Sequence, residues 1–255
     1  MDPLLDYTDK VVLITGAASG FGKQLAEDFS KRGAKLVLGD LNEEGVQAVA
    51  ASLDGPVAAM GCDVSQEDQC AAMVEAAIEL YGRLDIAVNN AGIAQAFTPL
   101  HQTTDELFDL QMDVNVKGVL YGMKHQIEAM KSQGEGVILN VSSMAGLNGA
   151  PKIGAYSAAK HAVIGLSKTA AVEYGKAGIR VNCVCPFFTL TPMVTDSEMT
   201  AGNPEQMEAF LSQGAPMKRL GQPHEITNVM LMLCSPGNTY MTGQCVAIDG
   251  GVSAL

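Results

Sequence analysis

Short apolar runs and amphipathic segments alternate along the whole chain. Largely apolar runs predict buried strands at 10–14, 36–38, 56–61, 84–88, 136–141, 179–184 and 244–248. Between them, apolar residues recur at helical spacing, most clearly over 43–53, 65–81, 104–132, 156–174 and 223–234. Because the strands are continuous apolar runs, we expect both of their faces to be buried, as in a parallel sheet. The pattern predicts one α/β domain over residues 1–255, with a seven-stranded parallel sheet flanked by helices on both faces.

Polar residues and glycines mark several ends of these elements. Asn42 is placed to cap the helix that follows it, and Ser65, with Asp68 three residues later, is a capping-type helix start. Gly33 suits the left-handed position that commonly ends a helix. These residues support the predicted boundaries.

One region departs from the alternation. From Thr189 to Gly214 the chain has no clean period until about Pro204. Such long connections inside a compact domain are often lids or binding loops. We therefore expect a substrate loop over about 187–214.

The composition fits a domain with a large core. Hydrophobic residues make up 47% of the chain and charged residues 17%, which argues against disorder. The net charge is −12, so the surface repels nucleic-acid phosphates and anionic membrane surfaces. No window reaches the apolar length of a membrane span. We expect neither nucleic acid nor a membrane as a partner.

The cysteines and histidines show no metal-binding pattern. None of the six cysteines forms C-x-x-C, and no Cys/His cluster has zinc spacing. Buried free thiols are typical of a reducing compartment. The first ten residues lack the apolar core of a signal peptide. These observations favour a cytoplasmic protein without a metal centre.

A glycine-rich turn links the first predicted strand to the next helix. Gly16, Gly20 and Gly22 stand in this turn. Glycines there let a diphosphate approach the backbone and meet the free N–H groups of the helix N-terminus. Ordinary turns also produce glycine triplets, but the strand–turn–helix context favours a dinucleotide site and a Rossmann-like, doubly wound fold.

Asp40 ends the second predicted strand, at about the distance expected for an acid that binds the adenosine ribose. A carboxylate there accepts hydrogen bonds from the ribose hydroxyls and repels a 2′-phosphate. Leu41 follows it, and Ala17 and Ala18 occupy the turn, so no basic side chain is placed to hold that phosphate. Although an end-of-strand Asp can also be an ordinary cap, the turn upstream favours NAD(H) over NADP(H).

Tyr156 and Lys160 stand one helical turn apart, so their side chains share a face. A free phenol titrates near ~10, and an adjacent cation lowers that pKa by favouring the phenolate. The same spacing also occurs on ordinary solvent-facing helices. The pair is a candidate acid/base device if other site residues accompany it.

Further motifs accompany it in a fixed order. The chain contains Thr15-Gly-x-x-x-Gly-x-Gly22, Asp63-Val64, Asn89-Asn-Ala-Gly92, Asn115, Ser143, Tyr156-x-x-x-Lys160 and Thr191-Pro-Met193. Together these motifs resemble the short-chain dehydrogenase/reductase family over essentially the whole chain. The resemblance implies an enzyme that transfers hydride between C4 of a nicotinamide and a secondary alcohol or ketone.

The resemblance also implies roles for four catalytic residues. Tyr156 is the expected general acid/base, and Lys160 is expected to lower its pKa and to bind the nicotinamide ribose. Ser143, at the family's usual distance before Tyr156, is chosen over Ser142 to stabilise the developing alkoxide. Asn115 resembles the asparagine whose backbone holds a water in a relay to the lysine, and its alternative interpretation is a helix-kinking residue.

The cofactor is expected to contact most of these motifs. The predicted cofactor-binding residues are Gly16, Ser19, Gly20, Phe21, Gly22, Asp40, Leu41, Asp63, Val64, Asn90, Ala91, Gly92, Tyr156, Lys160, Pro186, Thr189 and Thr191. Asp63 and Val64 are expected to bracket the adenine ring. Asn90 to Gly92 are expected to lie against the ribose and to support the sheet.

The chain leaves the family pattern after the sixth predicted strand. The family usually has Pro-Gly there, whereas this chain has Pro186-Phe187, and Thr189 replaces a usual aliphatic residue. Phe187 either narrows the wall near the nicotinamide or packs outward. Our hypothesis is a fairly apolar substrate pocket. Its predicted residues are Ser143, Met144, Leu147, Tyr156, Phe187, Phe188 and Met193.

Two other functions compete with an NAD-dependent alcohol dehydrogenase or ketone reductase. A 3-oxoacyl-carrier-protein reductase usually prefers NADPH and has basic patches, which Asp40 and the net charge disfavour. A nucleotide sensor of the same fold without catalysis is the other alternative, and the intact catalytic residues disfavour it. The resemblance further implies a homotetramer, paired through the helices at 104–132 and 156–174 and through the C-terminal helix and strand.

Overall fold

The seven predicted strands form one sheet in which every neighbouring pair is parallel. The computed structural model describes residues 3–195 and 204–255. The strands are β1 (Val11–Thr15), β2 (Lys35–Asp40), β3 (Val57–Gly61), β4 (Ile86–Asn89), β5 (Gly136–Val141), β6 (Ile179–Pro186) and β7 (Cys245–Ile248). Their order is β3-β2-β1-β4-β5-β6-β7. The predicted parallel, doubly wound sheet is thus confirmed.

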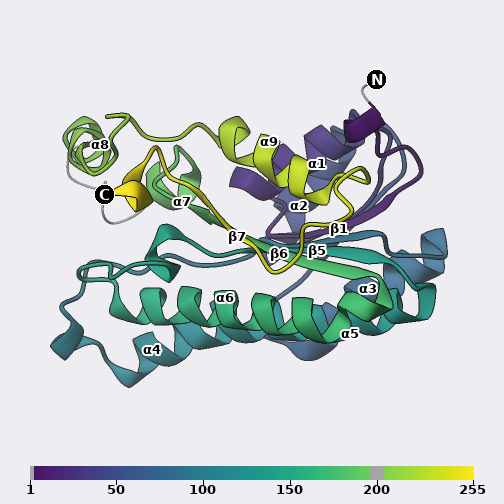
Figure 1. The fold of residues 1–255 in the computed structure, drawn as a ribbon, viewed down its shortest axis with the longest axis horizontal. Helices are drawn as coiled ribbons and strands as arrows, with labels where there is room; N and C mark the ends of the chain where they lie inside the picture. Colours follow the sequence, from purple (N-terminus) through teal and green to yellow (C-terminus); the bar gives the residue numbers. More distant parts are fainter. Residues whose placement is uncertain (1–2, 196–203) are drawn as a thin grey trace.

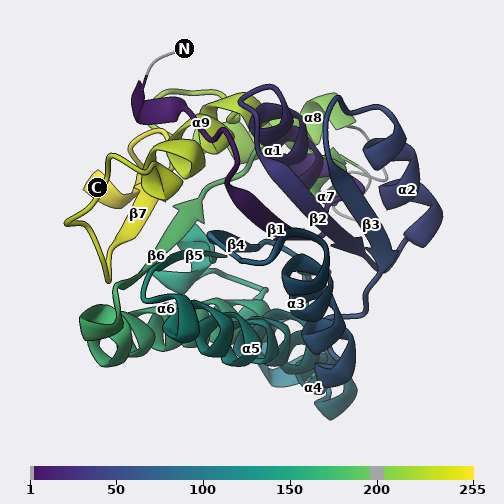
Figure 2. The same cartoon turned by 90° about the vertical axis from the view of Figure 1, so that its right-hand side faces the viewer.

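Helices cover both faces of this sheet (Figures 1 and 2). One face carries α1 (Gly20–Ser30), α2 (Glu43–Ala51) and α9 (Pro223–Cys234). The other carries α3 (Glu67–Tyr81), α5 (Gly118–Gln133) and α6 (Gly154–Tyr174), with α4 (Asp105–Met112) packed against α6. Along the described residues, no helix combines the length and apolar character needed to cross a membrane.

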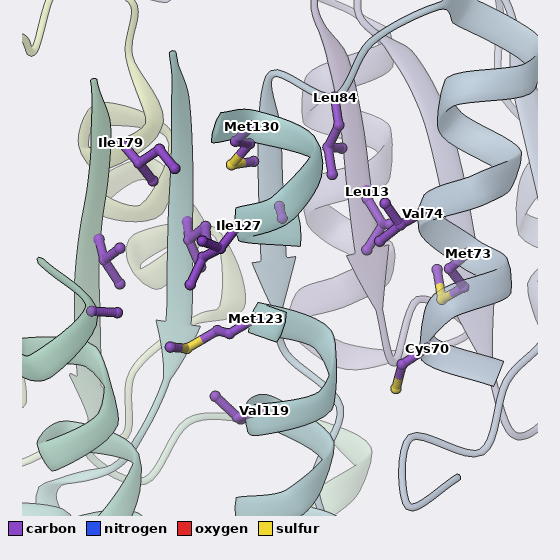
Figure 3. Packing of buried hydrophobic residues seen from close by; sticks show 14 of the residues in the cluster. Leu13, Cys70, Met73, Val74, Leu84, Val119, Met123, Ile127, Met130 and Ile179 are labelled. Atoms are coloured by element: carbon purple, nitrogen blue, oxygen red, sulfur yellow. The ribbon is translucent and has the colours of Figure 1, made fainter. Parts of the chain in front are cut away.

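The two layers are held to the sheet by two separate apolar cores. Within β1, Val11 and Leu13 belong to the core under α3, α5 and α6, whereas Val12 and Ile14 belong to the core under α1, α2 and α9. This alternation follows from the two-residue period of a strand. Figure 3 shows Leu13 beside Val74 of α3. Because both faces are buried, the strands are largely apolar on both faces, which is the pattern that predicted them.

The predicted helix over 104–132 is not continuous. A π-helical turn, Asp113–Lys117, separates α4 from α5, and the Gly118 N–H bonds to the Asp113 carbonyl five residues earlier. Asn115 lies inside this turn. Single π turns within α-helices are frequent at functional sites.

Of the two predicted helix caps, one is confirmed and one is wrong. The Asn42 side chain accepts the Gly45 N–H at the start of α2. Ser65 does not cap α3, which begins at Glu67. The Ser65 hydroxyl instead donates to Asp63 Oδ1 at 2.7 Å. The Asp63 carboxylate accepts from both the Ser65 N–H and its hydroxyl. The serine therefore stabilises the turn after β3 rather than the start of α3.

The predicted substrate loop over 187–214 contains two helices, α7 (Pro192–Thr195) and α8 (Pro204–Gln213). Residues 196–203 lie outside the described part of the chain. The loop is anchored where Thr189 pairs with Gly221 in an isolated parallel bridge. Figure 1 shows α7 and α8 on the same side of the sheet as α9.

Candidate active site

A large cavity lies along the carboxyl ends of the parallel strands. Its volume is about 1070 Å³, and residues at or just after the ends of β1 to β6 contribute to its wall. In open parallel sheets, ligands bind at this edge, where successive crossovers diverge. Here the divergence lies between β1 and β4, because β2 and β3 extend to one side and β5 to β7 to the other.

The glycine turn between β1 and α1 forms one end of the cavity. Gly16 and Gly20 have φ angles of 66° and 52°, which favour glycine. A Cβ on Gly22 would lie 2.1 Å from the Gly16 carbonyl oxygen, so only glycine lets α1 begin this close to the turn. Ser19 precedes α1 and makes no side-chain cap bond. The free N–H groups of this helix end fit the diphosphate of a dinucleotide.

Asp40, at the end of β2, lies beside the glycine turn and lines the same end of the cavity. Its two carboxylate oxygens accept the N–H groups of Ala18 and Asn42, both at 2.9 Å. Each carboxylate oxygen has a second acceptor site, so both can still accept from ribose hydroxyls. No arginine lines the cavity in the described part of the chain. The adenosine end thus presents a carboxylate that can accept further hydrogen bonds.

The segment after β4 is fixed to the glycine turn. Asn90 Nδ2 donates to the carbonyls of Thr15 and Gly16, at 2.9 and 3.1 Å. The Thr15 hydroxyl accepts the N–H groups of Asn90 and Ala91, at 3.0 and 3.1 Å. The Asn90–Gly92 motif thus has the structural role that the sequence predicted for it, and it also lines the cavity.

Ser143 and Tyr156 lie close together in the cavity wall. Ser143 follows β5, Tyr156 lies in the first turn of α6, and Ser143 is near enough to the phenol to influence its pKa. The neighbouring Ser142 is buried, and its hydroxyl donates to the Lys160 carbonyl oxygen at 2.8 Å. Because Ser142 is engaged in holding α6 to β5, the geometry supports Ser143 as the reactive serine.

Lys160 lies one turn after Tyr156 and is buried. Its Nζ donates to the Val141 carbonyl oxygen at 3.0 Å and lies 5.5 Å from the centre of the Tyr156 ring. Burial lowers the pKa of this ammonium to about 8.

The net pKa shift of Tyr156 is opposite in direction to the lowering that the sequence predicted. Burial raises the pKa of Tyr156, and the neighbouring Ser143 only partly opposes this shift. The physical reason is that the hydroxyl is desolvated while the ammonium, itself desolvated, is directed at the Val141 carbonyl.

Asn115 is fully buried and holds the segment after Gly92. Its Oδ1 accepts the Ile93 N–H at 3.1 Å, and its Nδ2 donates to the Ile93 carbonyl at 3.1 Å and to Gln111 Oε1 at 2.8 Å. A Cβ on Gly92 would lie 2.6 Å from Asn115 Oδ1 and 3.4 Å from Lys160 Nζ. The π turn therefore brings Asn115 next to Lys160, and its catalytic role stays a prediction.

Most of the predicted site residues line the one cavity. Three do not: Gly22, Asn115 and Leu147. Gly22 allows α1 to begin close to the Gly16 carbonyl. Asn115 lies outside the cavity lining and holds Ile93 by two hydrogen bonds. Leu147 is partly buried against the core under α6, outside the cavity lining, and its role as a substrate residue stays a prediction. The short helical turn Met144–Gly146 points Met144 toward the cavity instead.

The far end of the cavity has an apolar wall. Phe187 and Phe188 both line it, and their rings meet edge to face with centroids 4.9 Å apart. Met144 and Met193 line it as predicted. Phe187 also lines a second, smaller cavity, and a Cβ on Gly214 would lie 3.2 Å from its ring, so the ring packs near the end of α8.

Several wall residues were missed by the sequence analysis. They include Gln95, Phe97, Asn148, Ile153 and Val252, whereas Phe210 lies in the predicted substrate loop over 187–214 but was not singled out. Gln95 is a polar residue between two alanines, three positions after Gly92. An isolated polar residue so close to a predicted site motif could have identified it. Phe210 and Val252 carry no such signal, since tertiary packing alone brings α8 and the C-terminus here. Among the described residues, no group of acidic, histidine or cysteine side chains could hold a metal ion.

Comparisons with known proteins agree with this geometry. A family model described as enoyl-(acyl carrier protein) reductase matches residues 16–253. The 2,5-dichloro-2,5-cyclohexadiene-1,4-diol dehydrogenase of Sphingobium indicum is 39% identical over 251 residues, covering 98% of this chain and 99% of the relative. The cyclohexanol dehydrogenase of an Acinetobacter strain is 36% identical over 251 residues, covering 97% and 96%.

The chain belongs to the short-chain dehydrogenase/reductase family. Its fold matches the crystal structure of levodione reductase with a TM-score of 0.94 and 39% identity, covering 97% of this chain and 98% of the other. It also matches the 3-ketoacyl-(acyl-carrier-protein) reductase of Brucella melitensis, solved with NADH, with a TM-score of 0.90 and 36% identity, covering 97% and 100%. This short-chain dehydrogenase/reductase is thus a hydride-transfer oxidoreductase with a nicotinamide-nucleotide site, as the motifs predicted.

Proposed function

We propose that this protein is an NAD(H)-dependent dehydrogenase/reductase for secondary alcohols and ketones carried on a fairly apolar six-membered carbocycle. The observation that carries the proposal is the Ser143–Tyr156 pair beside the buried Lys160, in a cavity whose far wall is aromatic and aliphatic. Two relatives are named for cyclohexane-type alcohols. An apolar wall buries a hydrocarbon ring favourably.

The cofactor site supports NAD(H). The α1 N-terminus and the glycine turn would hold the diphosphate, and Asp40 would accept from the adenosine ribose hydroxyls. A 2′-phosphate there would meet the Asp40 carboxylate with no arginine to offset it. When bound, the nicotinamide supplies or accepts the hydride.

The protein's own groups handle the proton. In ketone reduction, the Tyr156 hydroxyl donates a proton to the substrate oxygen while the Ser143 hydroxyl donates a hydrogen bond to it. In alcohol oxidation, the tyrosinate accepts the proton. Because burial raises the pKa of Tyr156, the protonated form prevails at neutral pH, and the charged Lys160 is the nearby cation that stabilises the phenolate when it forms.

Other assignments follow from the same observations. We propose a homotetramer, because large apolar side chains are exposed on the paired helices and near the C-terminus: Phe108, Leu110, Leu120, Val172, Met232 and Leu255. We also propose a cytoplasmic location, in keeping with six free cysteines. A 3-oxoacyl-carrier-protein reductase is less well supported, since a surface of net charge −12 repels an acidic carrier protein.

A coenzyme-coupled substrate panel tests the proposal. Cyclic and open-chain secondary alcohols and their ketones are assayed with NAD(H) and NADP(H) side by side. We expect turnover of the cyclic substrates and a preference for NAD(H). Turnover only of acyl-carrier-protein thioesters, or a preference for NADP(H), would contradict it.

Tyr156→Phe separates an enzyme from a nucleotide sensor. Removing the hydroxyl should lower kcat about 10²- to 10⁴-fold, the usual contribution of acid/base catalysis, while NADH binding, followed by its fluorescence, is retained. If the wild type binds NADH but turns over no substrate in the panel, the result supports the nucleotide-sensor interpretation.

A further inference from the structure

The NH₂ group of one buried side-chain amide in the cavity wall has no hydrogen-bond partner. In the described part of the chain, three buried side-chain atoms lack a hydrogen bond: Nε2 of Gln95, Oγ1 of Thr103 and Nε2 of His125. His125 Nε2 lies 3.4 Å from a Glu67 carboxylate oxygen, and Thr103 does not line the cavity. Gln95 does line it, and the side chain is 97% shielded, with 3% exposed.

The orientation of the Gln95 amide is fixed from the other end. Its Oε1 accepts the backbone N–H of Tyr156 at 2.9 Å. That N–H lies in the first turn of α6, where helix N–H groups have no partner within the helix. Because a backbone N–H can only donate, the oxygen must face it, and the NH₂ group is left for a different partner.

The neighbouring amides show that this unused donor is specific to Gln95. Gln111 Nε2 donates to the Ala94 carbonyl at 3.0 Å, and its Oε1 accepts from Asn115. Asn115 also uses both ends of its amide on Ile93. Residues 93–95 are therefore held by three side-chain amides, of which only Gln95 has an NH₂ group with no acceptor. A buried donor without an acceptor is costly, so a bound molecule that supplies an acceptor is favoured at this point.

The surroundings indicate which acceptor. Gln95 holds the turn of α6 that carries Tyr156, so it belongs to the substrate end of the cavity. The neighbouring wall there is largely apolar, with Ile93, Phe97 and Ile153 among its residues. A neutral amide N–H in this wall can pair with an uncharged carbonyl or hydroxyl oxygen without burying a charge.

We propose that Gln95 is a substrate-specificity residue whose Nε2 donates to a second oxygen of the substrate, distinct from the oxygen that exchanges its proton with Tyr156. The preferred substrates are then dioxygenated carbocycles, namely diketones, hydroxyketones or diols. This inference rests on the proposed function, since it concerns the substrate of the same site.

The test compares substrates with one and two oxygens. The kcat/KM of cyclohexanone is measured against those of 1,2-, 1,3- and 1,4-cyclohexanedione for the wild type. We expect at least one dione to be preferred by about 10- to 100-fold, the effect of supplying or withholding an acceptor for a buried donor. Equal values for the monoketone and all three diones would overturn the inference.

Two substitutions at Gln95 distinguish the role of its amide oxygen from that of its NH₂ group. Gln95→Glu keeps an oxygen for the Tyr156 N–H but replaces the donor with an acceptor, and Gln95→Met removes both. In both variants the dione-to-monoketone ratio should fall toward one. Gln111→Met is the matched control, since it removes a buried amide from the same segment but no free donor, and its ratio should stay that of the wild type. A wild-type ratio in Gln95→Glu and Gln95→Met would overturn the inference.

A binding measurement separates failure of the inference from failure of the proposed function. NADH-loaded Tyr156→Phe is titrated with cyclohexanone and with the preferred dione, and thermal stabilisation reports binding without turnover. Tighter dione binding that is lost on adding Gln95→Glu supports the inference even if the reaction has been misassigned. Equal binding of both ketones contradicts the inference even if the enzyme reduces them.

Discussion

At the residue scale, the acid/base pair depends on two groups that the fold desolvates together. Tyr156 and Lys160 share a helix face, and burial makes the charged form of each unfavourable. Ser143 lies near the tyrosine in the cavity wall, whereas Lys160 donates to the Val141 carbonyl. The helix spacing therefore predicts which residues meet, but the sign of the tyrosine pKa shift depends on burial that a spacing does not reveal.

The buried lysine should leave a signature in the pH dependence of stability. Its pKa is about 8 in the folded chain and about 10.4 for a free lysine. Between these values the unfolded chain binds more protons, so the free energy of unfolding rises with pH, by at most about 1.4 kcal/mol per pH unit. The destabilisation caused by burying the charged Lys160 ammonium is fully present below pH 8, and it is relieved as the pH rises through 8 toward 10.4.

Lys160→Met removes the titrating group at similar length. Urea denaturation of both proteins from pH 7 to pH 10 gives the difference in their free energies of unfolding. We expect the wild type to gain stability relative to the variant above pH 8. A difference that does not change with pH would show that Lys160 titrates normally in the folded chain.

At the element scale, the site depends on how the segment after β4 sits between the π turn and α6. Gly92 is the tightest point, because a Cβ there would lie 2.6 Å from Asn115 Oδ1 and 3.4 Å from Lys160 Nζ. Such separations force the asparagine or the segment to shift. Sequence patterning does not reveal this contact, since an added residue in a helical turn leaves the amphipathic period of 104–132 almost unchanged.

Gly92→Ala should therefore impair catalysis more than folding. We expect kcat to fall at least about 10-fold, since small displacements of catalytic groups have large effects on rate. Gly175→Ala is the control, because a Cβ at Gly175 meets nothing within 4 Å, and its kcat should match the wild type. Gly92→Ala with wild-type kinetics would show that the Asn115–Lys160 spacing is not critical.

The Phe187 substitution tests the wall after β6. Phe187→Gly removes a ring that lines the cavity, so the ranking of ketones should shift toward bulkier rings, while Phe187→Leu should keep the wild-type order. Substrate panels with both variants measure this. An unchanged ranking and unchanged NAD affinity in Phe187→Gly would show that the ring does not shape the substrate site.

At the scale of the whole molecule, the sequence predicted the sheet and most of the cavity wall because both depend on strong local signals. Continuous apolar runs fixed the seven strands, and Gly16, Asp40 and Asn90 stand at strand ends, where a parallel sheet gathers them on one edge. Leu147 and Phe210 show the limit. Their directions are set by a short helical turn and by the packing of α8, and neither leaves a periodic trace.

Exposed apolar side chains are the basis for the proposed homotetramer. Val172, on α6, is 84% exposed, and Val172→Glu should weaken a tetramer by placing a charge in a contact between chains. Light scattering is expected to give the mass of four 26.7 kDa chains for the wild type and a smaller mass for the variant. Leu80→Glu, which changes an exposed residue of α3, should keep the wild-type mass. A monomeric wild type at micromolar concentration would contradict the tetramer.

The division of the cavity along the chain has a consequence for how such an enzyme can diversify. Most residues predicted for the adenosine end lie before position 93, whereas the predicted substrate residues and the remaining predicted cofactor residues lie after it: Tyr156, Lys160, Pro186, Thr189 and Thr191. Mutations of Phe187, Phe188 and α8 residues can therefore alter what is processed while the adenosine end is inherited intact. A combinatorial library confined to these segments would explore new substrates at little risk to coenzyme use, and genes recombined near codon 93 would exchange one specificity for another in a single step.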